Sequence, residues 1–554
     1  YGAVEQTMIR PTLVWNPTDL SELVVRYEYT DISGDGPVAQ SHLNGRERNE
    51  GATPPASSTF FDRNDFGVAN DLMGSQDIET DFLTLQYDQG VALGDGNVTF
   101  IYGYRDSSQQ ALSDIDAQPF AAFHAPTWLE AEQNSLELRY SGRFGNANIT
   151  TGAYWFDNDI AYHERRDLLG ALTAQLTGGA LGPDVSFQIQ DGGGNYEVET
   201  LGFFGAVDYD LSDRLTLTAG LRYTEEEKSA EIATLALNTN VLNIPATLGT
   251  GTLTYANPIN GMDTRCNIVL RNDCPLDFQD DDSWTTWSPK LGLTYVLSDT
   301  ARVYGHWTRG FRSGGYNLRN TSPIATPGPF DEEQVDSFEI GYKSTNSWGR
   351  LNAAVFYTEV SDMQREVNTA SETSAVVQVI DNTADATLMG LEIDGTFRIS
   401  DSLLLLTSFG YIDAEYDSVR FDLNGDGEIN AADEDLDLPR APEMTYSIGL
   451  NYDWNIGSWG YATARISYAY RDETFFTDDN RGLINDQDIL DAGIDFYSND
   501  ESWVFSLYGR NLLDTVKHGG ATQLPQALGP LPLGGTFAPL AKGEVYGAEV
   551  TYSF

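Results

Sequence analysis

Hydrophobic and polar residues alternate along much of the chain. In the segment 391–400, LEIDGTFRIS, the odd positions are apolar or glycine and the even positions are polar or charged. The segments 461–470 (YATARISYAY) and 546–554 (YGAEVTYSF) repeat this alternation. A period of two predicts β-strands with one apolar and one polar face. Because the polar faces carry Glu, Asp and Arg, they favour a barrel wall between lipid and a wet lumen over a soluble sandwich.

Short and long connections separate the predicted strands in alternation. The short connections are 16–19, 211–213, 297–300, 399–402 and 455–458. The long connections are 32–77, 107–133, 160–195, 228–283 and 419–442. This alternation predicts an all-β, transmembrane, antiparallel up-and-down β-barrel over residues 1–554, with short periplasmic turns and long extracellular loops. Compact soluble domains, the alternative, rarely carry so many long loops.

The number of predicted strands has a consequence for the topology. Counting back from Phe554 gives about nineteen strands. The last strand should end on the periplasmic side, so the segment 6–17, nineteen strands back, should also run inward. A barrel chain that arrives from the periplasm cannot start with such a strand. We therefore expect at least one further strand before Tyr1.

Composition and the absence of catalytic motifs narrow the classes of function. The 554 residues carry 83 acidic and 32 basic side chains, a formal net charge of −51, which excludes nucleic acid as a partner. No apolar run approaches the roughly 18 residues of a membrane-spanning helix. The chain has no nucleophile elbow, no HExxH zinc motif and no phosphate-binding loop, and its 5 His are scattered. We therefore expect that the protein is not an enzyme.

Seven stretches between about residues 200 and 554 resemble the TonB-dependent outer-membrane receptors. In the order of that family, they are 220–228 (GLRYTEEEK), 287–317, 330–362, 390–416, 438–454, 508–514 (YGRNLLD) and 546–554. The resemblance implies a barrel of about 22 strands in the outer membrane of a Gram-negative bacterium, surrounded by lipid and lipopolysaccharide. It also implies active import of a scarce nutrient, most often a ferric siderophore, with energy from the TonB complex supplied through an N-terminal plug.

The sequence departs from this family at its beginning. It shows no plug, no energy-coupling box and no counterpart of the first three strands before Tyr1, so we expect it to be part of a longer protein. Two other functions stay open. One is a porin-like channel without a plug, which steady ion conductance in a bilayer would reveal. The other is a surface scaffold or adhesion protein whose loops are ordered by calcium.

The stretch 421–435, FDLNGDGEINAADED, matches the pattern of a calcium-binding loop. Its ligands at positions 1, 3, 5, 7, 9 and 12 would be Asp422, Asn424, Asp426, Glu428, Asn430 and Asp433, with Glu428 contributing its backbone carbonyl. Gly427 permits the sharp turn, and Ile429 stands where an apolar residue usually anchors such a loop. We expect a structural Ca²⁺ in an extracellular loop; a solvated acidic loop is the alternative.

The 2 cysteines, Cys266 and Cys274, lie in the predicted long loop 228–283. In the oxidising environment of a cell envelope they should form a disulfide that closes a short loop. Two free thiols, or a metal ion held by the pair, are the alternatives, and no histidine accompanies the cysteines to support the second of these.

Arginines at the outer end of one predicted strand are candidates for ligand capture. They are Arg309, Arg312 and Arg319, with Tyr316 between them. Arginines beside an aromatic ring could hold an anionic ferric chelate by charge-assisted hydrogen bonds. In a chain with 83 acidic residues they could also serve only to balance nearby carboxylates.

A second group of candidates lies in the segment 119–128. It contains Phe120, Phe123, His124 and Trp128 in a predicted outward loop. These side chains would either contact the ligand or pack the loop against its neighbours, and the sequence leaves both readings open.

Overall fold

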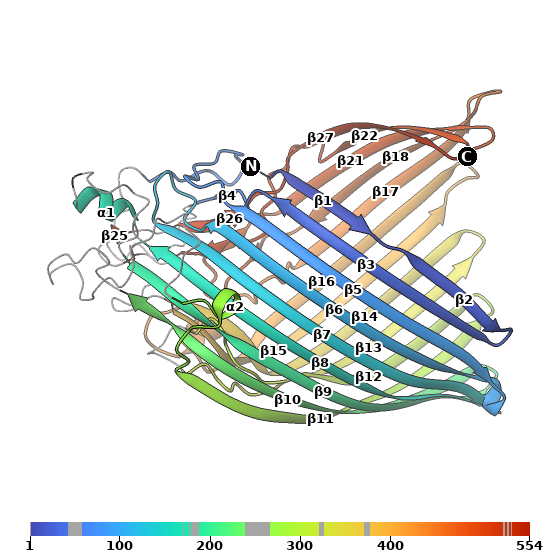
Figure 1. Cartoon of the computed structure of the whole chain (residues 1–554). Coiled ribbons are helices and arrows are strands. Elements are labelled where there is room, and N and C mark those ends of the chain that lie inside the picture. The colour runs from blue at the N-terminus through green and yellow to red at the C-terminus, as the bar shows by residue number, and fades with distance from the viewer. Residues whose placement is uncertain are drawn as a thin grey trace.

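The computed structural model is almost entirely β-sheet (Figure 1). It describes residues 2–42, 58–168, 170–176, 178, 188–238, 266–320, 326–369, 377–524, 527–528, 531–532 and 535–554. None of the helices in these ranges is long and apolar enough to cross a membrane.

Twenty strands form the main sheet, each antiparallel to its neighbours. They are β1 (Val4–Ile9), β2 (Thr12–Thr18), β3 (Ser21–Gly34), β5 (Ser75–Val91), β6 (Gly96–Asp114), β7 (Phe123–Phe144), β8 (Ala147–Leu168), β9 (Gln188–Ser212), β10 (Leu215–Asn238), β11 (Phe278–Ser298), β12 (Ala301–Arg312), β13 (Glu333–Asn346), β14 (Gly349–Thr369), β15 (Val377–Arg398), β16 (Leu403–Val419), β17 (Met444–Asn455), β18 (Gly460–Arg471), β21 (Gln487–Ser498), β22 (Trp503–Arg510) and β27 (Val545–Tyr552).

The count of nineteen wall strands is confirmed. β1 and β2 pair with successive parts of the same partner, β3, so together they fill one position in the wall, which leaves 20 − 1 = 19 positions. The break between β1 and β2 falls at Pro11, which has no backbone N–H to donate to the ladder. Among the described residues, the edge strands β1/β2 and β27 do not pair with each other.

Small elements occupy the connections between wall strands. The short strands are β4 (Ala39–Gln40), β19 (Thr474–Phe475), β20 (Leu483–Ile484), β23 (Thr522–Gln523), β24 (Ala527–Leu528), β25 (Leu531–Pro532) and β26 (Thr536–Pro539). The helices are η1 (Leu93–Asp95), α1 (Gly170–Leu176), α2 (Ile268–Arg271) and α3 (Ala431–Glu434). β4 pairs with β26, which joins the first long connection to the last one.

Short and long connections separate to opposite ends of the wall, as predicted. The five predicted short connections all lie between consecutive paired strands, at what we call the short-turn end. Figure 1 shows the helices α1 and α2 and the long connections toward the opposite end of the strands, the long-loop end.

The predicted boundaries of three long loops are wrong. The segments 107–133, 160–195 and 228–283 contain substantial lengths of strand, because β6 continues to Asp114, β8 to Leu168 and β10 to Asn238. Alternating hydrophobicity stops where the lipid stops, but backbone hydrogen bonds between neighbouring strands do not need apolar side chains. The hairpins therefore extend beyond the apolar band, where the sequence no longer marks them.

The wall has an apolar outer face. Large side chains such as Ile340, Leu293 and Val355 point outward with 67%, 50% and 50% of their surface exposed, which suits contact with lipid. Aromatic pairs mark the short-turn end, including Trp348 with Phe397 and Trp503 with Tyr552. Rings of this kind are typical of the membrane–water interface.

Candidate functional site

Strand register decides which of the predicted arginines face the lumen. Arg309 lies directly opposite Asp336, and Ile340 lies on the same face of β13 as Asp336. Because Ile340 belongs to the outer face, Arg309 also points away from the lumen. Its Nε and Nη2 donate to the two Asp336 oxygens at 3.0 and 2.8 Å. The pairing with Asp336 fits the alternative that Arg309 balances a nearby carboxylate, and its role as a ligand contact stays a prediction.

Arg312 is the last residue of β12, at the long-loop end, and its side chain lies on the opposite face, which is turned to the lumen. It pairs in register with Glu333, the residue that begins β13. The Arg312 side chain is exposed. Within the described ranges, no carboxylate forms an ion pair with its guanidinium. Of the predicted arginines, Arg312 is the one left available to a ligand.

Arg312 belongs to a cavity of about 500 Å³ against the inner wall at the long-loop end. β12 to β16 form the wall, and the segment 438–442, between α3 and β17, forms the roof. The lining includes Arg312, Glu333, Phe356, Val360, Met363, Gln364, Arg365, Leu388, Glu392, Leu438, Pro439, Arg440 and Pro442. The cavity therefore combines apolar and aromatic surface with a few charged groups, as small-molecule sites do.

The charge of this cavity differs from that of the chain. Three arginines and two glutamates line it, a net charge of +1, whereas the whole chain carries −51. Arg365 is held by Asp478, with Nε 2.8 Å from the carboxylate. Arg440 lies over the ring of Phe476, 4.2 Å from its centroid. With Arg365 paired to Asp478, the guanidinium groups of Arg312 and Arg440 are the cationic groups that an anionic ligand could approach in this cavity.

The sequence reasoning missed Arg365 and Arg440. Arg365 lies on β14 and Arg440 in the segment 438–454, and they reach the same cavity because β14 and the roof segment meet there. A signal was available for Arg440, since an arginine between two prolines in LPRAP stands out in a chain with only 32 basic residues.

The roof of the cavity continues from the predicted calcium loop. Leu423 of this loop and Leu438 of the roof segment join a buried apolar cluster with Val360, Met363 and Tyr416 of the wall. Leu423 is 3% exposed, whereas Ile429 is 56% exposed. The expectation that Ile429 anchors the loop is therefore wrong, because the loop docks through its first turn and not through position 8.

The predicted loop folds with its carboxylates turned toward its own backbone. Asp422 accepts hydrogen bonds from the N–H groups of Asp426 and Gly427 at 3.0 and 2.8 Å. The buried Asp433 accepts from Asn424 and Asn430 at 3.0 and 2.9 Å. Gly427 has a φ of +94°, which only glycine adopts without strain.

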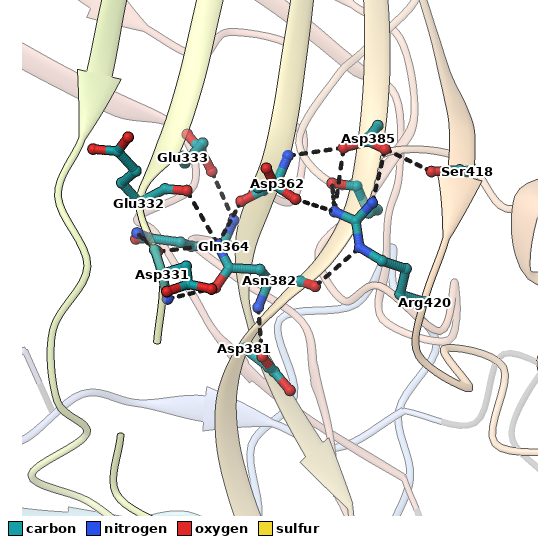
Figure 2. Close-up of polar contacts among 11 residues, drawn as sticks. Asp331, Glu332, Glu333, Asp362, Gln364, Asp381, Asn382, Asp385, Ser418 and Arg420 are labelled. Carbon is teal, nitrogen blue, oxygen red and sulfur yellow. Dashed lines mark hydrogen bonds and ion pairs between the residues drawn. The ribbon is translucent and has the colours of Figure 1, made fainter. Parts of the chain in front are cut away.

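An ion-pair cluster fastens the base of this loop to strands β14 and β15 (Figure 2). Asp385 lies on the outer face, because it alternates with Ala384 and Ala386, which are buried inside. Arg420 donates to both oxygens of Asp385 at 2.8 and 3.2 Å, and to Asp362 at 3.0 Å. Asn382 extends the cluster by donating to the carbonyl of Asp331 at 3.0 Å. The loop is thus held from outside by Arg420 and from inside by Leu423.

The structure joins Cys266 and Cys274 by a disulfide, with a Cα–Cα distance of 4.8 Å. The bridged loop contains α2 and lies against β8, where the backbone N–H of Ile268 points at Nδ1 of His163 at 3.5 Å. Cys266 is 2% exposed. The bridge therefore holds a short helical loop against the long-loop end of the wall.

Tyr316 and Arg319 do not face a ligand cavity. Tyr316 is 6% exposed and packs in an apolar cluster with Ile232 and Trp284, so its prediction as a ligand contact is wrong. Arg319 forms an ion pair with Glu164 at 2.7 Å, as the alternative of charge balance predicts. Burial alone would raise the pKa of Glu164, but Arg166 and Arg319 hold it well below its usual range.

The aromatic stretch 119–128 packs the loops. Phe123, His124 and Trp128 are 6%, 3% and 2% exposed, and Phe120 is half-buried. The ring of Trp128 lies 5.7 Å from that of His163, the residue that the disulfide-bridged loop contacts through Ile268. The burial of Phe123, His124 and Trp128 supports the alternative that this stretch packs the loop against its neighbours.

Comparison with known proteins identifies the family. The profile described as "TonB dependent receptor-like, beta-barrel" matches residues 14–512. The chain belongs to this family of TonB-dependent receptor β-barrels. It is 24% identical over 226 residues to the pesticin receptor of Yersinia pestis, covering 41% of this chain and 31% of that one. It is also 24% identical over 248 residues to the rhizobactin receptor of Rhizobium meliloti strain 1021, covering 41% and 29%.

Solved structures share the fold of this TonB-dependent barrel. The ferric yersiniabactin uptake receptor FyuA from Yersinia pestis superposes with a TM-score of 0.71 and 16% identity, covering 100% of this chain and 71% of the receptor. The siderophore receptor PiuA from Acinetobacter baumannii gives 0.71 and 14%, covering 99% and 74%. The matches to the curated relatives span about a third or less of their length.

Proposed function

We propose that this barrel is part of an outer-membrane receptor that binds an anionic ferric chelate outside the cell and imports it with energy from the TonB complex. The long-loop end would face the exterior and the short-turn end the periplasm. The observation that supports this most directly is the cavity at the long-loop end, where Arg312 lies exposed to the lumen without a carboxylate partner among the described residues.

The chemistry of the cavity fits such a ligand. Ferric chelates of catechols and hydroxycarboxylates carry negative charge, and the catecholates also present flat aromatic rings. Arg312 and Arg440 supply charged donors, and Phe356 supplies an apolar face. The relatives named as siderophore receptors support the same class of substrate. The family and these relatives are receptors, so no catalytic role is proposed.

Uptake of radioactive iron by cells that lack other ferric-chelate receptors tests this function. The probes are ferric citrate, a ferric catecholate and a ferric hydroxamate, given to cells that carry the full-length protein. Loss of one charge-assisted hydrogen bond, about 1.5–3 kcal/mol, should weaken binding of the accepted chelate about 10- to 100-fold in Arg312→Gln. Arg309→Gln is the matched control, since that guanidinium faces outward.

The two variants give clear outcomes. Reduced uptake in Arg312→Gln with unchanged uptake in Arg309→Gln supports the proposal. Uptake of none of the three chelates, or equal uptake by both variants and the wild type, contradicts it. Deletion of the TonB complex should abolish accumulation while surface binding remains, and accumulation that survives this deletion would argue for a passive channel.

We also propose that the loop 422–433 holds a structural Ca²⁺ through Asp422, Asn424, Asp426, Glu428, Asn430 and Asp433. The ion would neutralise the carboxylates of the loop and thereby stabilise the roof segment that follows it. Calorimetric titration of the purified protein with Ca²⁺ should show one site that Asp426→Asn weakens at least tenfold. Glu434→Gln, an exposed α3 residue outside the ligand set, should leave the titration unchanged; equal behaviour of the two variants would refute the site.

A further inference from the structure

A second cluster of metal-ligating side chains lies at the long-loop end, away from the cavity. Asp71, Asp114 and His124 each place one ligand atom within 4.8 Å of the others. Asp114 ends β6 and His124 lies near the start of β7, directly opposite in register. Asp71 comes from the segment 58–74 that precedes β5. The cluster thus joins two connections that are separate in the sequence.

Backbone hydrogen bonds fix the positions of these ligands. Asp114 accepts from the N–H of Asp71 at 3.1 Å and from that of Ala117 at 2.9 Å. Gln118 accepts from the N–H of Thr59 at 2.7 Å, and its own side chain donates back to the Thr59 carbonyl at 3.1 Å. The two chain segments are therefore already held together without a metal, which lowers the cost of organising a site.

The histidine in this cluster has an unused ring nitrogen. Nε2 of His124 lies 2.8 Å from Asp71, whereas Nδ1 is buried and has no hydrogen-bond partner. The whole residue is 3% exposed. A buried polar atom without a partner costs free energy, so a simple His–Asp ion pair does not account for this arrangement.

Buried carboxylates outnumber the one base near them. Asp116, fully buried, accepts from Gln118 and Ala122 at 3.0 and 3.1 Å and lies close enough to Asp114 and His124 to affect their charge. Three carboxyl groups, those of Asp71, Asp114 and Asp116, thus lie around the single imidazole of His124. Buried like charges repel strongly, and a divalent cation removes most of this excess.

We propose that Asp71, Asp114 and His124 form a binding site for a divalent first-row metal ion, for which Zn²⁺ is the best-fitting probe. One imidazole and two carboxylates are a ligand set that zinc accepts, with water in the remaining position. The side chain of Asp71 is 25% exposed and provides the route from solvent. Bound metal ties the segment 58–74 to the β6–β7 hairpin.

Zinc titration of the full-length protein purified from outer membranes tests this site. Saturating Ca²⁺ keeps the oxygen-rich loop at 422–433 from competing. The wild type should take up one Zn²⁺ per chain and release a proton, which calorimetry in two buffers of different ionisation enthalpy detects. Co²⁺ should give the intense visible bands of a tetrahedral site.

Matched variants separate this site from adventitious binding. His124→Gln and Asp114→Asn should each weaken Zn²⁺ binding at least tenfold. His163→Gln is the control, because His163 is also buried and pairs with a single carboxylate, Asp191, at 2.7 Å. Wild-type protein that binds no Zn²⁺, or equal losses in all three variants, would overturn the proposal.

A variant that fails to fold would also lose Zn²⁺ binding, so folding has to be checked separately. Heat-modifiable migration in gels, which reports a folded barrel, is therefore measured on each preparation. If His124→Gln is unfolded by this assay, Asp71→Asn replaces it, since Asp71 is partly exposed and its loss leaves the β6–β7 pairing intact.

Discussion

Arg420 donates two parallel hydrogen bonds to Asp385, from Nη1 to Oδ2 at 2.8 Å and from Nη2 to Oδ1 at 3.2 Å. Arg420 is the first residue after β16, so this contact fixes the point where the chain leaves the wall and enters the loop over the lumenal cavity. The same guanidinium reaches Asp362 on the neighbouring β14, as Figure 2 shows. The direction of the loop is thus set on the outer face, while its apolar residues pack inside.

Arg420→Gln should loosen this loop without unfolding the barrel. The ion pairs are partly exposed, so their loss is worth at most about 1 kcal/mol, and amide exchange in the segment 421–442 should accelerate up to roughly fivefold. Hydrogen exchange followed by mass spectrometry measures this. Arg350→Gln is the control, because Arg350 pairs with Asp394 at 3.3 Å near the short-turn end. Equal acceleration in the two variants would show that Arg420 has no special role.

Acidification should loosen a different contact, between the first and last long connections. His42 and His518 lie 4.7 Å apart, ring to ring, and both Nε2 atoms lie 3.0 Å from Oε1 of Gln40. Burial, together with Arg63 nearby, lowers their pKa values to about 3 and about 4. The folded loops therefore keep both rings neutral where the unfolded chain would bind protons.

The sign of the effect follows from these depressed values. Unfolded histidine binds a proton below about pH 6.5, so the contact is fully stable above that pH and weakens progressively as pH falls toward 4. Limited proteolysis of the segment 35–42 at pH 7.5 and pH 5, corrected for protease activity on a denatured substrate, should show faster cleavage at pH 5. A His42→Asn/His518→Asn variant should lose this pH dependence, and a variant that keeps it would contradict the explanation.

The fold could be predicted from the sequence because lipid imposes a simple rule on the wall. Alternation such as that in 391–400 has one physical solution when one face meets lipid and the other meets water, and the strand count followed from it. The extensions of β6, β8 and β10 into solvent could not be predicted in this way. Their pairing depends on backbone hydrogen bonds with the neighbouring strand, which leave no apolar trace in the sequence.

The candidate site was only partly predictable for a related reason. The sequence does not tell which of the two faces of a strand is turned to the lumen near its end. Only the register with β13 shows that Arg312, and not Arg309, faces the lumen. Arg365 reaches the cavity from the bulged strand β14, and Arg440 reaches it from the roof segment 438–442. No local sequence pattern shows that these two parts of the chain lie at the same cavity. In contrast, the turn chemistry of 422–433 is local, so its folding around Gly427 could be read directly.

The docking of the loop 422–433 on the wall should depend on Leu423 far more than on Ile429. Leu423→Ala removes a buried side chain from the cluster with Val360 and Tyr416, which typically costs about 2–5 kcal/mol. The loop should then open more often, and binding of the accepted ferric chelate should weaken because the roof residues Leu438 and Arg440 move with it. Ile429→Ala, at an exposed position, should change neither hydrogen exchange nor chelate binding; a comparable loss in both variants would contradict this docking.

The buried ion pairs at the end of β8 should make the stability of the long-loop end sensitive to the loss of Glu164. Glu164 is 2% exposed and receives hydrogen bonds from both Arg166 and Arg319, at 2.5 and 2.7 Å. Glu164→Gln leaves two guanidinium groups short of a counter-charge, one of them fully buried, and should destabilise the local packing by about 3–5 kcal/mol. Hydrogen exchange in the segments 160–168 and 313–320 should report this loss.

A neighbouring acid provides the control for Glu164. Glu366 lies 3.9 Å from the same Arg319, but its side chain is 41% exposed, so water can replace the carboxylate in Glu366→Gln. We expect a change in exchange of about fivefold or less for that variant, against a hundredfold or more for Glu164→Gln. Similar effects of the two substitutions would mean that burial does not set the strength of these ion pairs. The network at the end of β8 would then be as well solvated as the outer face.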